Sequence, residues 1–202
     1  SNYQLEVAKG NIAGSASFEK FGRNSDIDIA TTPEDIWNGG GDYTGFPTGS
    51  AEIMEVFSSD ANDTAAGTGA RTIRVYNLLD GTGAEASAQD VILNGTTPVD
   101  VHATNTYYRG ATRVKVLTAG TGGENAGTIT IRHKTTTANV FAVMPPGLNQ
   151  TAIAAYTVPL GKTLYISRVN FQMGRASGAN GSALMSFRNR PDGGVFNTTQ
   201  LP

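Results

Sequence analysis

The feature that most restricts the fold is a succession of short strand-forming segments, nearly all bounded by glycine, proline, asparagine or aspartate. In residues 71–79, RTIRVYNLL, Ile73 and Val75 alternate with Arg74 and Tyr76, the period of two expected for a strand with unlike faces. The other candidate strands are residues 51–59, 86–95, 106–120, 126–135, 138–145, 151–159, 163–173 and 183–190. Short strands at this spacing predict an all-β fold, either a β-sandwich or a jelly roll.

The composition agrees with many strands joined by tight turns. The 202 residues include 25 Gly, no Cys and 16% charged residues, and Gly supplies the positive φ that tight turns need. Little helix is expected: only residues 32–39, TPEDIWNG, offer a Thr followed by Pro and two acids, which suits one short turn. We expect a single β-sandwich domain over residues 31–202, preceded by an extended arm over residues 1–30.

The expected arm shows no sustained period in residues 11–28, but it carries apolar side chains that would gain from burial against a partner. Its candidate anchoring residues are Ile12, Phe18, Phe21 and Arg23. Residues 35–48, DIWNGGGDYTGFPT, are expected to form an ordered loop. Packing of Trp37, Tyr43 and Phe46 on the sandwich or on a neighbouring chain would offset the freedom of three consecutive glycines, and the alternative is a mobile loop.

Charge is distributed unevenly, although the net charge is only -2. Residues 1–70 hold three basic and eleven acidic residues, a net -8, and the rest of the chain holds twelve and six, a net +6. The two parts should attract each other within one chain or between neighbours, and the alternative is a solvated acidic loop beside ordinary surface arginines. The candidates for charge contacts between subunits are Asp26, Asp28, Glu34 and Asp35 with Arg109, Arg113, Lys115, Arg168, Arg188 and Arg190.

Motifs for catalysis or metal binding have little support. Residues 80–86, DGTGAEA, match the glycine pattern of a dinucleotide loop, but the strand-like sequence after them offers no helix N-terminus to a pyrophosphate. Residues 60–64, DANDT, lack the later ligands of a calcium loop and fit an Asx-rich turn better. His102 and His133 support no local metal motif, and an exposed or edge position suits His133 better than a general base. We expect no catalytic residue, metal or cofactor.

Two segments resemble each other within the chain. AAGTGARTIRV, residues 65–75, and ENAGTITIRHK, residues 124–134, share Ala-Gly-Thr followed shortly by Thr-Ile-Arg. Two hairpin units related by duplication would explain the match, and chance repetition of turn composition is the alternative.

Three segments resemble structural proteins of tailed bacteriophages: residues 3–24, YQLEVAKGNIAGSASFEKFGRN; residues 35–75, which begin DIWNGGGDYTGFPTG; and residues 156–169, YTVPLGKTLYISRV. The resemblance implies a non-enzymatic virion protein, a capsid decoration or cement protein or another head-associated protein. Its implied partners are the major capsid protein or a neighbouring head or tail component, and further copies of itself, with a homotrimer favoured. Neither a nucleic acid nor a membrane is expected as a partner.

Two other functions stay open. A receptor- or glycan-binding module of a tail or fibre would use exposed aromatic side chains around Tyr107 and Tyr108. A sugar- or wall-cleaving enzyme would need two carboxylates about 5–10 Å apart in a cleft.

Overall fold

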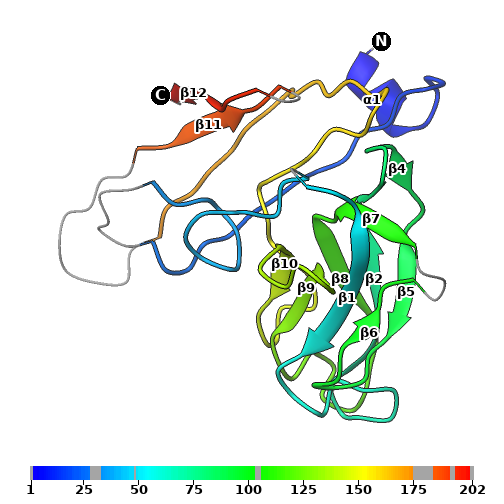
Figure 1. Ribbon diagram of the computed structural model, residues 1–202. Helices are drawn as coiled ribbons and strands as arrows, with labels where there is room; N and C mark the ends of the chain where they lie inside the picture. The colour runs from blue at the N-terminus through cyan, green and yellow to red at the C-terminus, as the bar shows by residue number, and fades with distance from the viewer. Residues whose placement is uncertain are drawn as a thin grey trace. The chain divides into compact units, whose positions relative to one another are not determined.

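The structure is a computed structural model of the 202-residue chain, and it describes residues 2–27, 33–47, 49–102, 106–174, 184–191 and 194–200 (Figure 1). The chain divides into two compact units, Ser1–Thr163 and Leu164–Pro202. The described residues form α1 (Tyr3–Ala8), β1 (Glu52–Ser58), β2 (Ala70–Tyr76), β3 (Leu78–Asp80), β4 (Glu85–Ala86), β5 (Gln89–Ile92), β6 (Val99–Asp100), β7 (Tyr107–Gly110), β8 (Arg113–Ala119), β9 (Ile129–His133), β10 (Val140–Met144), β11 (Ser186–Asn189) and β12 (Asn197–Gln200).

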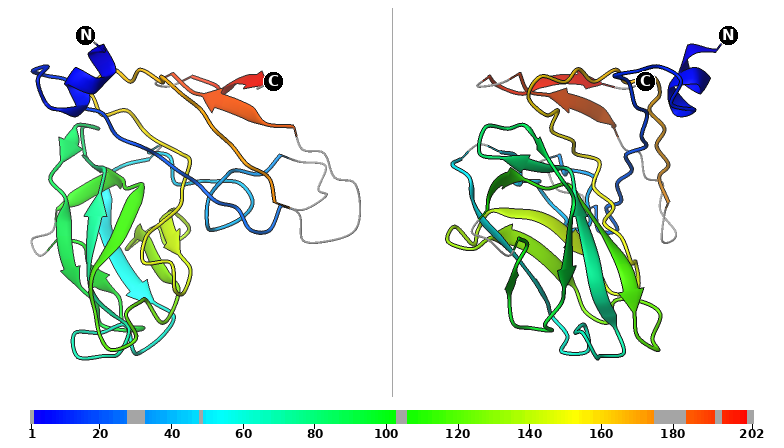
Figure 2. Two further views of the ribbon diagram at one scale, coloured as in Figure 1. Left: turned by 180° about the vertical axis from the view of Figure 1, so that it is seen from behind. Right: turned by 90° about the vertical axis from the view of Figure 1, so that its right-hand side faces the viewer.

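The first unit contains two antiparallel sheets. One follows the order β10-β9-β1-β7-β3-β4, with β6 also paired to β1, and the other follows the order β5-β2-β8. Figures 1 and 2 show these strands gathered around one interior. A single apolar core joins both sheets, with Met54 and Ile131 from one and Ile73 and Val114 from the other. The all-β prediction is confirmed in its β-sandwich form, whereas a jelly-roll connectivity is not.

Strand β2 shows why the alternating sequence folds this way. Ile73 and Val75 are fully buried, whereas Arg74 faces solvent and pairs with Asp90 on β5, with Nη2 2.6 Å from Oδ2. Period-2 alternation therefore assigns one face of the strand to the core and the other to water, as predicted. The candidate strand 106–120 divides into β7 and β8.

Three local predictions were wrong. Residues 33–39 form no helix: Trp37 makes a β-bridge with Ile153, and its burial outweighs the local preference for a helical turn. The helix lies instead at α1, where the Asn2 side chain caps Gln4 N at 3.1 Å. Residues 151–159 form only that one bridge, and residues 163–173 form no strand, because neither segment has a sheet partner among the described residues.

The second half of the expected arm packs on the body of its own unit. Arg23 N donates to Ala152 O at 3.3 Å, and Ala154 N donates to Ile36 O at 2.8 Å. Gly22 lies between them, so close that an added Cβ would stand 2.4 Å from Ile36 O and 2.5 Å from Ala154 N. A segment from the start of the chain is thus held against residues near position 150. The division into an arm of residues 1–30 and a domain of residues 31–202 stays a prediction.

Candidate functional site

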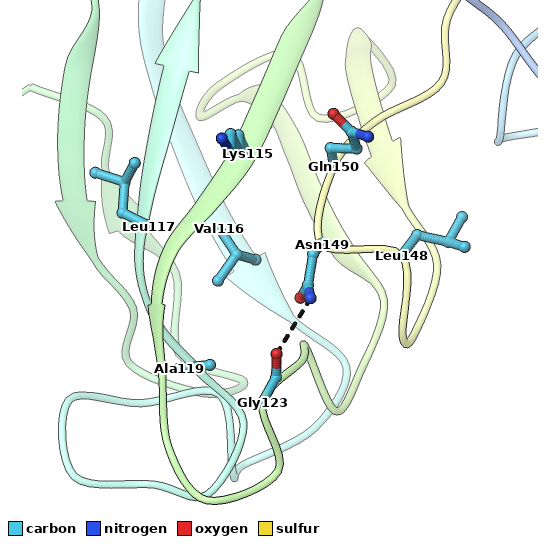
Figure 3. Close-up of a pocket in the computed structure, with 8 residues that line it drawn as sticks. All are labelled: Lys115, Val116, Leu117, Ala119, Gly123, Leu148, Asn149 and Gln150. Carbon is cyan, nitrogen blue, oxygen red and sulfur yellow. Dashed lines mark hydrogen bonds between the residues drawn. The ribbon is translucent and has the colours of Figure 1, made fainter.

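A surface pocket of about 350 Å³ lies beside the edge strand β8 (Figure 3). Val116 N donates to Asn149 O at 2.8 Å, and Asn149 Nδ2 donates to Gly123 O at 3.2 Å, so the chain after β10 closes one side of the pocket. Its lining residues are Lys115, Val116, Leu117, Ala119, Gly123, Leu148, Asn149 and Gln150. Lys115 is the one titratable side chain in this lining. The lining of this pocket therefore holds no pair of titratable side chains.

A second pocket, of about 210 Å³, adjoins the first. It shares Leu148 and Gln150 with it and is otherwise lined by Phe21, Gly22, Arg23 and Ala152. Residues 21–23 of the arm thus form one wall of the second pocket. Leu148, Gln150 and Ala152, which follow β10, form the other wall.

The loop that was expected to hold three aromatic side chains is ordered by them. Trp37 is 7% exposed and Tyr43 is 4% exposed, with their rings 5.1 Å apart in an edge-to-face arrangement. Phe46 packs edge-on against Tyr43 at 5.0 Å, and the Tyr43 hydroxyl donates to Phe141 O at 2.9 Å. Burial raises the pKa of the Tyr43 hydroxyl above its ordinary value. The three rings pack on the sandwich of their own chain, and their contact with other chains stays a prediction.

Two of the acidic candidates brace this loop. Glu34 Oε2 accepts from Asn24 Nδ2 at 2.9 Å and from Gly41 N at 3.2 Å. Asp35 Oδ2 accepts from Tyr43 N at 2.8 Å. Both carboxylates therefore stabilise the loop within their own chain, and their contact with another subunit stays a prediction.

The other acidic and anchoring candidates lie at or near the surface. Asp26 is exposed, and Asp28 lies outside the described residues. Ile12 is half-buried, whereas Phe18 and Phe21 are 51% and 44% exposed. Phe18 also contacts the Tyr156 ring, with the centroids 4.8 Å apart. Arg23 is exposed beside the second pocket.

The basic candidates are divided between the two units, and each is described within its own unit. Arg109 Nη2 donates to Pro47 O at 3.2 Å, and the Arg113 guanidinium lies 5.5 Å from the centre of the Tyr76 ring. Lys115 lines the pocket of Figure 3. In the second unit, Arg168 Nε donates to Asn170 Oδ1 at 3.1 Å, and Arg188 and Arg190 each lie 5.1 Å from the centre of the Phe196 ring.

Within the described residues, an ion pair joins the acidic part of the sequence, residues 1–70, to the basic remainder of the chain. Glu55 on β1 is 6% exposed, and its Oε1 lies 2.8 Å from Arg132 Nη2 on the adjacent strand β9. Part of the expected attraction between the two halves of the sequence thus acts within the first unit.

His133 is buried, at 2% exposed, so the prediction of an exposed or edge position was wrong. Its Nε2 lies 3.0 Å from Tyr108 O, a carbonyl that can only accept, so Nε2 donates. Its Nδ1 lies 3.3 Å from Asn139 Nδ2, and its ring packs edge-on against Phe141 at 4.6 Å. The alternation in β9 buries Ile129, Ile131 and His133 together. A buried histidine with a polar partner at each ring nitrogen and an aromatic ring packed against it is a core residue.

Asp63 forms a buried polar cluster that the sequence did not indicate. The side chain is 0% exposed and accepts four hydrogen bonds: Ser58 Oγ at 2.6 Å, Ala70 N at 2.7 Å, and Ala126 N and Gly127 N, each at 2.8 Å. These donors occupy the carboxylate oxygens, which leaves them unsuited to calcium.

The two similar sequence segments meet at this carboxylate, because Ala70 belongs to one and Ala126 and Gly127 to the other. Their origin by duplication stays a prediction. Nearby, Asp60 Oδ1 accepts from Asn62 N at 2.8 Å, which confirms the Asx turn in residues 60–64.

The second unit exposes its apolar side chains. Among its described residues none is buried, and nine large apolar side chains are at least 37% exposed. They are Leu164, Tyr165, Ile166, Val169, Phe171, Met173, Leu184, Phe187 and Val195. The sequence pattern predicted a strand at residues 163–173, but it carried no information about which segment would pair with that strand.

The aromatic pair considered for a sugar site is divided between surface and core. Tyr107 is 54% exposed, whereas Tyr108, the next residue of β7, is 2% exposed. The two rings therefore cannot form one exposed platform.

The described residues contain no group of three or more His, Asp or Glu side chains placed to hold a metal ion. None of the helices in this part of the chain is long and apolar enough to span a membrane. Comparison of the chain with protein-family models, with curated proteins and with solved structures finds no match.

Proposed function

We propose that the chain is a non-enzymatic structural component of a bacteriophage particle, located in the virion as a capsid decoration or cement protein or another head-associated protein. The observation that carries this proposal is the exposed apolar surface of the Leu164–Pro202 unit. Exposed large apolar side chains in this number favour a place where another protein binds, because water-exposed apolar area is otherwise kept small. Residues 3–24, 35–75 and 156–169 resemble phage structural proteins, so we expect that partner to be another protein of a phage particle.

Side-chain hydrogen bonds connect the loops of the first unit, which supports a role as a particle component. Two asparagines join its loops: Asn125 N donates to Asn149 Oδ1 at 3.1 Å, and Asn149 N donates to Asn125 Oδ1 at 3.0 Å. Asn125 Nδ2 also donates to Pro145 O at 2.8 Å. Together with the Asp63 cluster, these bonds hold the turns at one end of the sandwich, and held turns resist proteolytic nicking.

The proposed partners are the major capsid protein or a neighbouring head or tail component, together with further copies of the chain, a homotrimer being the favoured assembly. The net -8 of residues 1–70 and the net +6 of the rest support contact between unlike parts of neighbouring copies. Exposed charge pairs are worth only about 0–1 kcal/mol each, so charge would select the orientation and apolar contact would supply the affinity.

Quantitative mass spectrometry of density-purified particles tests the proposal. We expect the chain in a fixed molar ratio to the major capsid protein, unchanged by a second round of purification, and antibodies against it should label the particle surface. Recovery of the chain only in the particle-free fraction of the same lysate would contradict the proposal.

A further inference from the structure

Residues 163–173, TLYISRVNFQM, have the composition of a strand but lie outside any sheet that the structure describes. Leu164 and Ile166 are 37% and 50% exposed, and Val169, Phe171 and Met173 are 51%, 48% and 57% exposed. An extended segment in this state offers both apolar side chains and backbone N–H and C=O groups to a partner.

The other described residues of the second unit form no buried core that covers this segment. Its described strands, β11 and β12, form a two-stranded hairpin, an arrangement that is marginally stable in isolation. The charged side chains among the described residues of the unit are Arg168, Arg188 and Arg190, all basic. Its partner should therefore be extended, apolar and acidic.

The docked arm of the first unit offers a surface of that kind. Between Glu19 and Ser25, burial alternates residue by residue, as in a strand that is covered on one side only. Lys20, Gly22 and Asn24 face inward: the Lys20 amine donates to Thr112 O, Gly22 packs against Ile36, and Asn24 bonds Glu34.

Exposed apolar and acidic groups lie along residues 18–27 of the arm. Phe18, Phe21 and Ile27 are 51%, 44% and 54% exposed, and Glu19 and Asp26 are exposed beside them. One basic residue, Arg23, is also exposed in this segment. We call residues 18–27 the arm ridge; it carries more acidic than basic exposed groups and leads into the acidic part of the sequence.

We propose that the arm ridge of one copy pairs with residues 163–173 of a second copy, so that the arm supplies the strand that the second unit lacks. This inference rests on the proposed function, because a particle component is expected to contact its own copies. The contact joins two different surfaces and is therefore heterologous: its repetition gives a ring, such as a trimer, where the rotation between copies closes, and an open filament where it does not. The pairing uses apolar contact between Phe18, Phe21 and Ile27 and the exposed side chains of residues 163–173.

Disulfide trapping tests the pairing directly, since the chain has no cysteine. One protein carries Ser25→Cys, a second of different tag length carries Ser167→Cys, and a control carries Ser87→Cys, another exposed serine. After mixing and mild oxidation we expect the Ser25→Cys and Ser167→Cys chains to form a mixed dimer at least about tenfold faster than either forms with the control. A rate no higher than the control overturns the proposal. So does preferential dimerisation of Ser167→Cys with itself, or, in the doubly substituted chain, trapping only within single molecules.

Self-association provides an independent measurement. Phe18→Ser with Phe21→Ser, and Phe171→Ser with Met173→Ser, should each weaken association in sedimentation equilibrium by about tenfold or more, because each removes two apolar contacts from one side of the same interface. Ile92→Ser, which removes a side chain 63% exposed on β5, should leave association unchanged. Unaltered association in both double variants overturns the pairing.

The two proposals can fail separately. A chain that is monomeric in solution and in the particle, yet present there in fixed ratio, contradicts the pairing alone. A chain that pairs as described but is absent from purified particles contradicts the proposed function alone.

Discussion

Both units contain strand-like sequence with alternating apolar residues, but among the described residues only the first unit buries them. In β2 of the first unit, alternation buries Ile73 and Val75 completely. In residues 164–173 of the second unit, Val169 and Phe171 remain about half exposed. Period-2 alternation thus shows that a segment can become a strand with one apolar face, but burial also requires a partner sheet. We infer that the second unit finds its partner in another chain.

The two units also differ in whether they bury polar side chains. The first unit buries Asp63, Asn125 and His133 because each has hydrogen-bond partners at short range. Among the described residues of the second unit, no polar side chain is buried. A buried polar group needs a complete shell of donors and acceptors, and only a packed interior can supply one.

The largest expected effect comes from one matched pair of substitutions. Phe141→Ala removes a ring that is 2% exposed and should lower the free energy of unfolding by about 3–5 kcal/mol. Phe171→Ala removes a ring that is 48% exposed and should change it by less than about 0.5 kcal/mol in the monomer. Urea unfolding followed by the fluorescence of Trp37, the single tryptophan, measures both. Comparable losses of unfolding free energy in the two variants would contradict the difference in side-chain burial between the two units.

Asp63→Ala should have the next largest effect. It leaves Ala70 N, Ala126 N and Gly127 N without their acceptor in a buried place, which should cost about 3 kcal/mol or more. Asp60→Ala, which removes an Asx turn a few residues away, should cost about 1 kcal/mol and is the matched control. Equal losses for the two variants in the same urea experiment would show that the buried cluster does not stabilise the sandwich.

Gly22→Ala should displace the arm from the body of the first unit and should lower the free energy of unfolding by less than Asp63→Ala does. The added Cβ would collide with backbone atoms of Ile36 and Ala154, so the arm must shift, at about 1–3 kcal/mol. Native trypsin digestion should then cleave faster after Lys20 and Arg23. Gly49→Ala has open space around it and should leave the digestion pattern of the wild type. Protection of the arm in Gly22→Ala would contradict the docked arrangement.

A further effect is a pH dependence of arm docking. Burial, with the nearby Arg113, lowers the pKa of Lys20 from 10.5 to about 7. Between these values the unfolded chain binds more protons than the folded chain, so the stability contributed by the docked arm rises with pH over this window and is level below it.

The Lys20→Met variant isolates this dependence. Relative to Lys20→Met, the wild type should gain stability in urea unfolding between about pH 7 and about pH 9. Parallel stability profiles of the two proteins would show that the amine is not buried in the folded arm.

Sequence reasoning succeeded where the signal was local. The strands of the sandwich follow from alternation, and the packing of Trp37, Tyr43 and Phe46 follows from three aromatic rings in a glycine-rich loop. It failed at His133, whose alternation with Ile129 and Ile131 marked the core face but was outweighed by its polarity. The role of Asp63 had no such signal, because most of its donors are backbone N–H groups as far as 64 residues away, which residue types do not reveal.

Amide hydrogen exchange of residues 163–173 tests the central claim most directly. The account predicts fast exchange in the dilute monomer and exchange slowed by at least about tenfold in the assembled state, whereas β1 of the first unit is protected in both. Exchange in residues 163–173 that is equally fast in the monomer and in the assembly would contradict the claim that another chain completes the second unit.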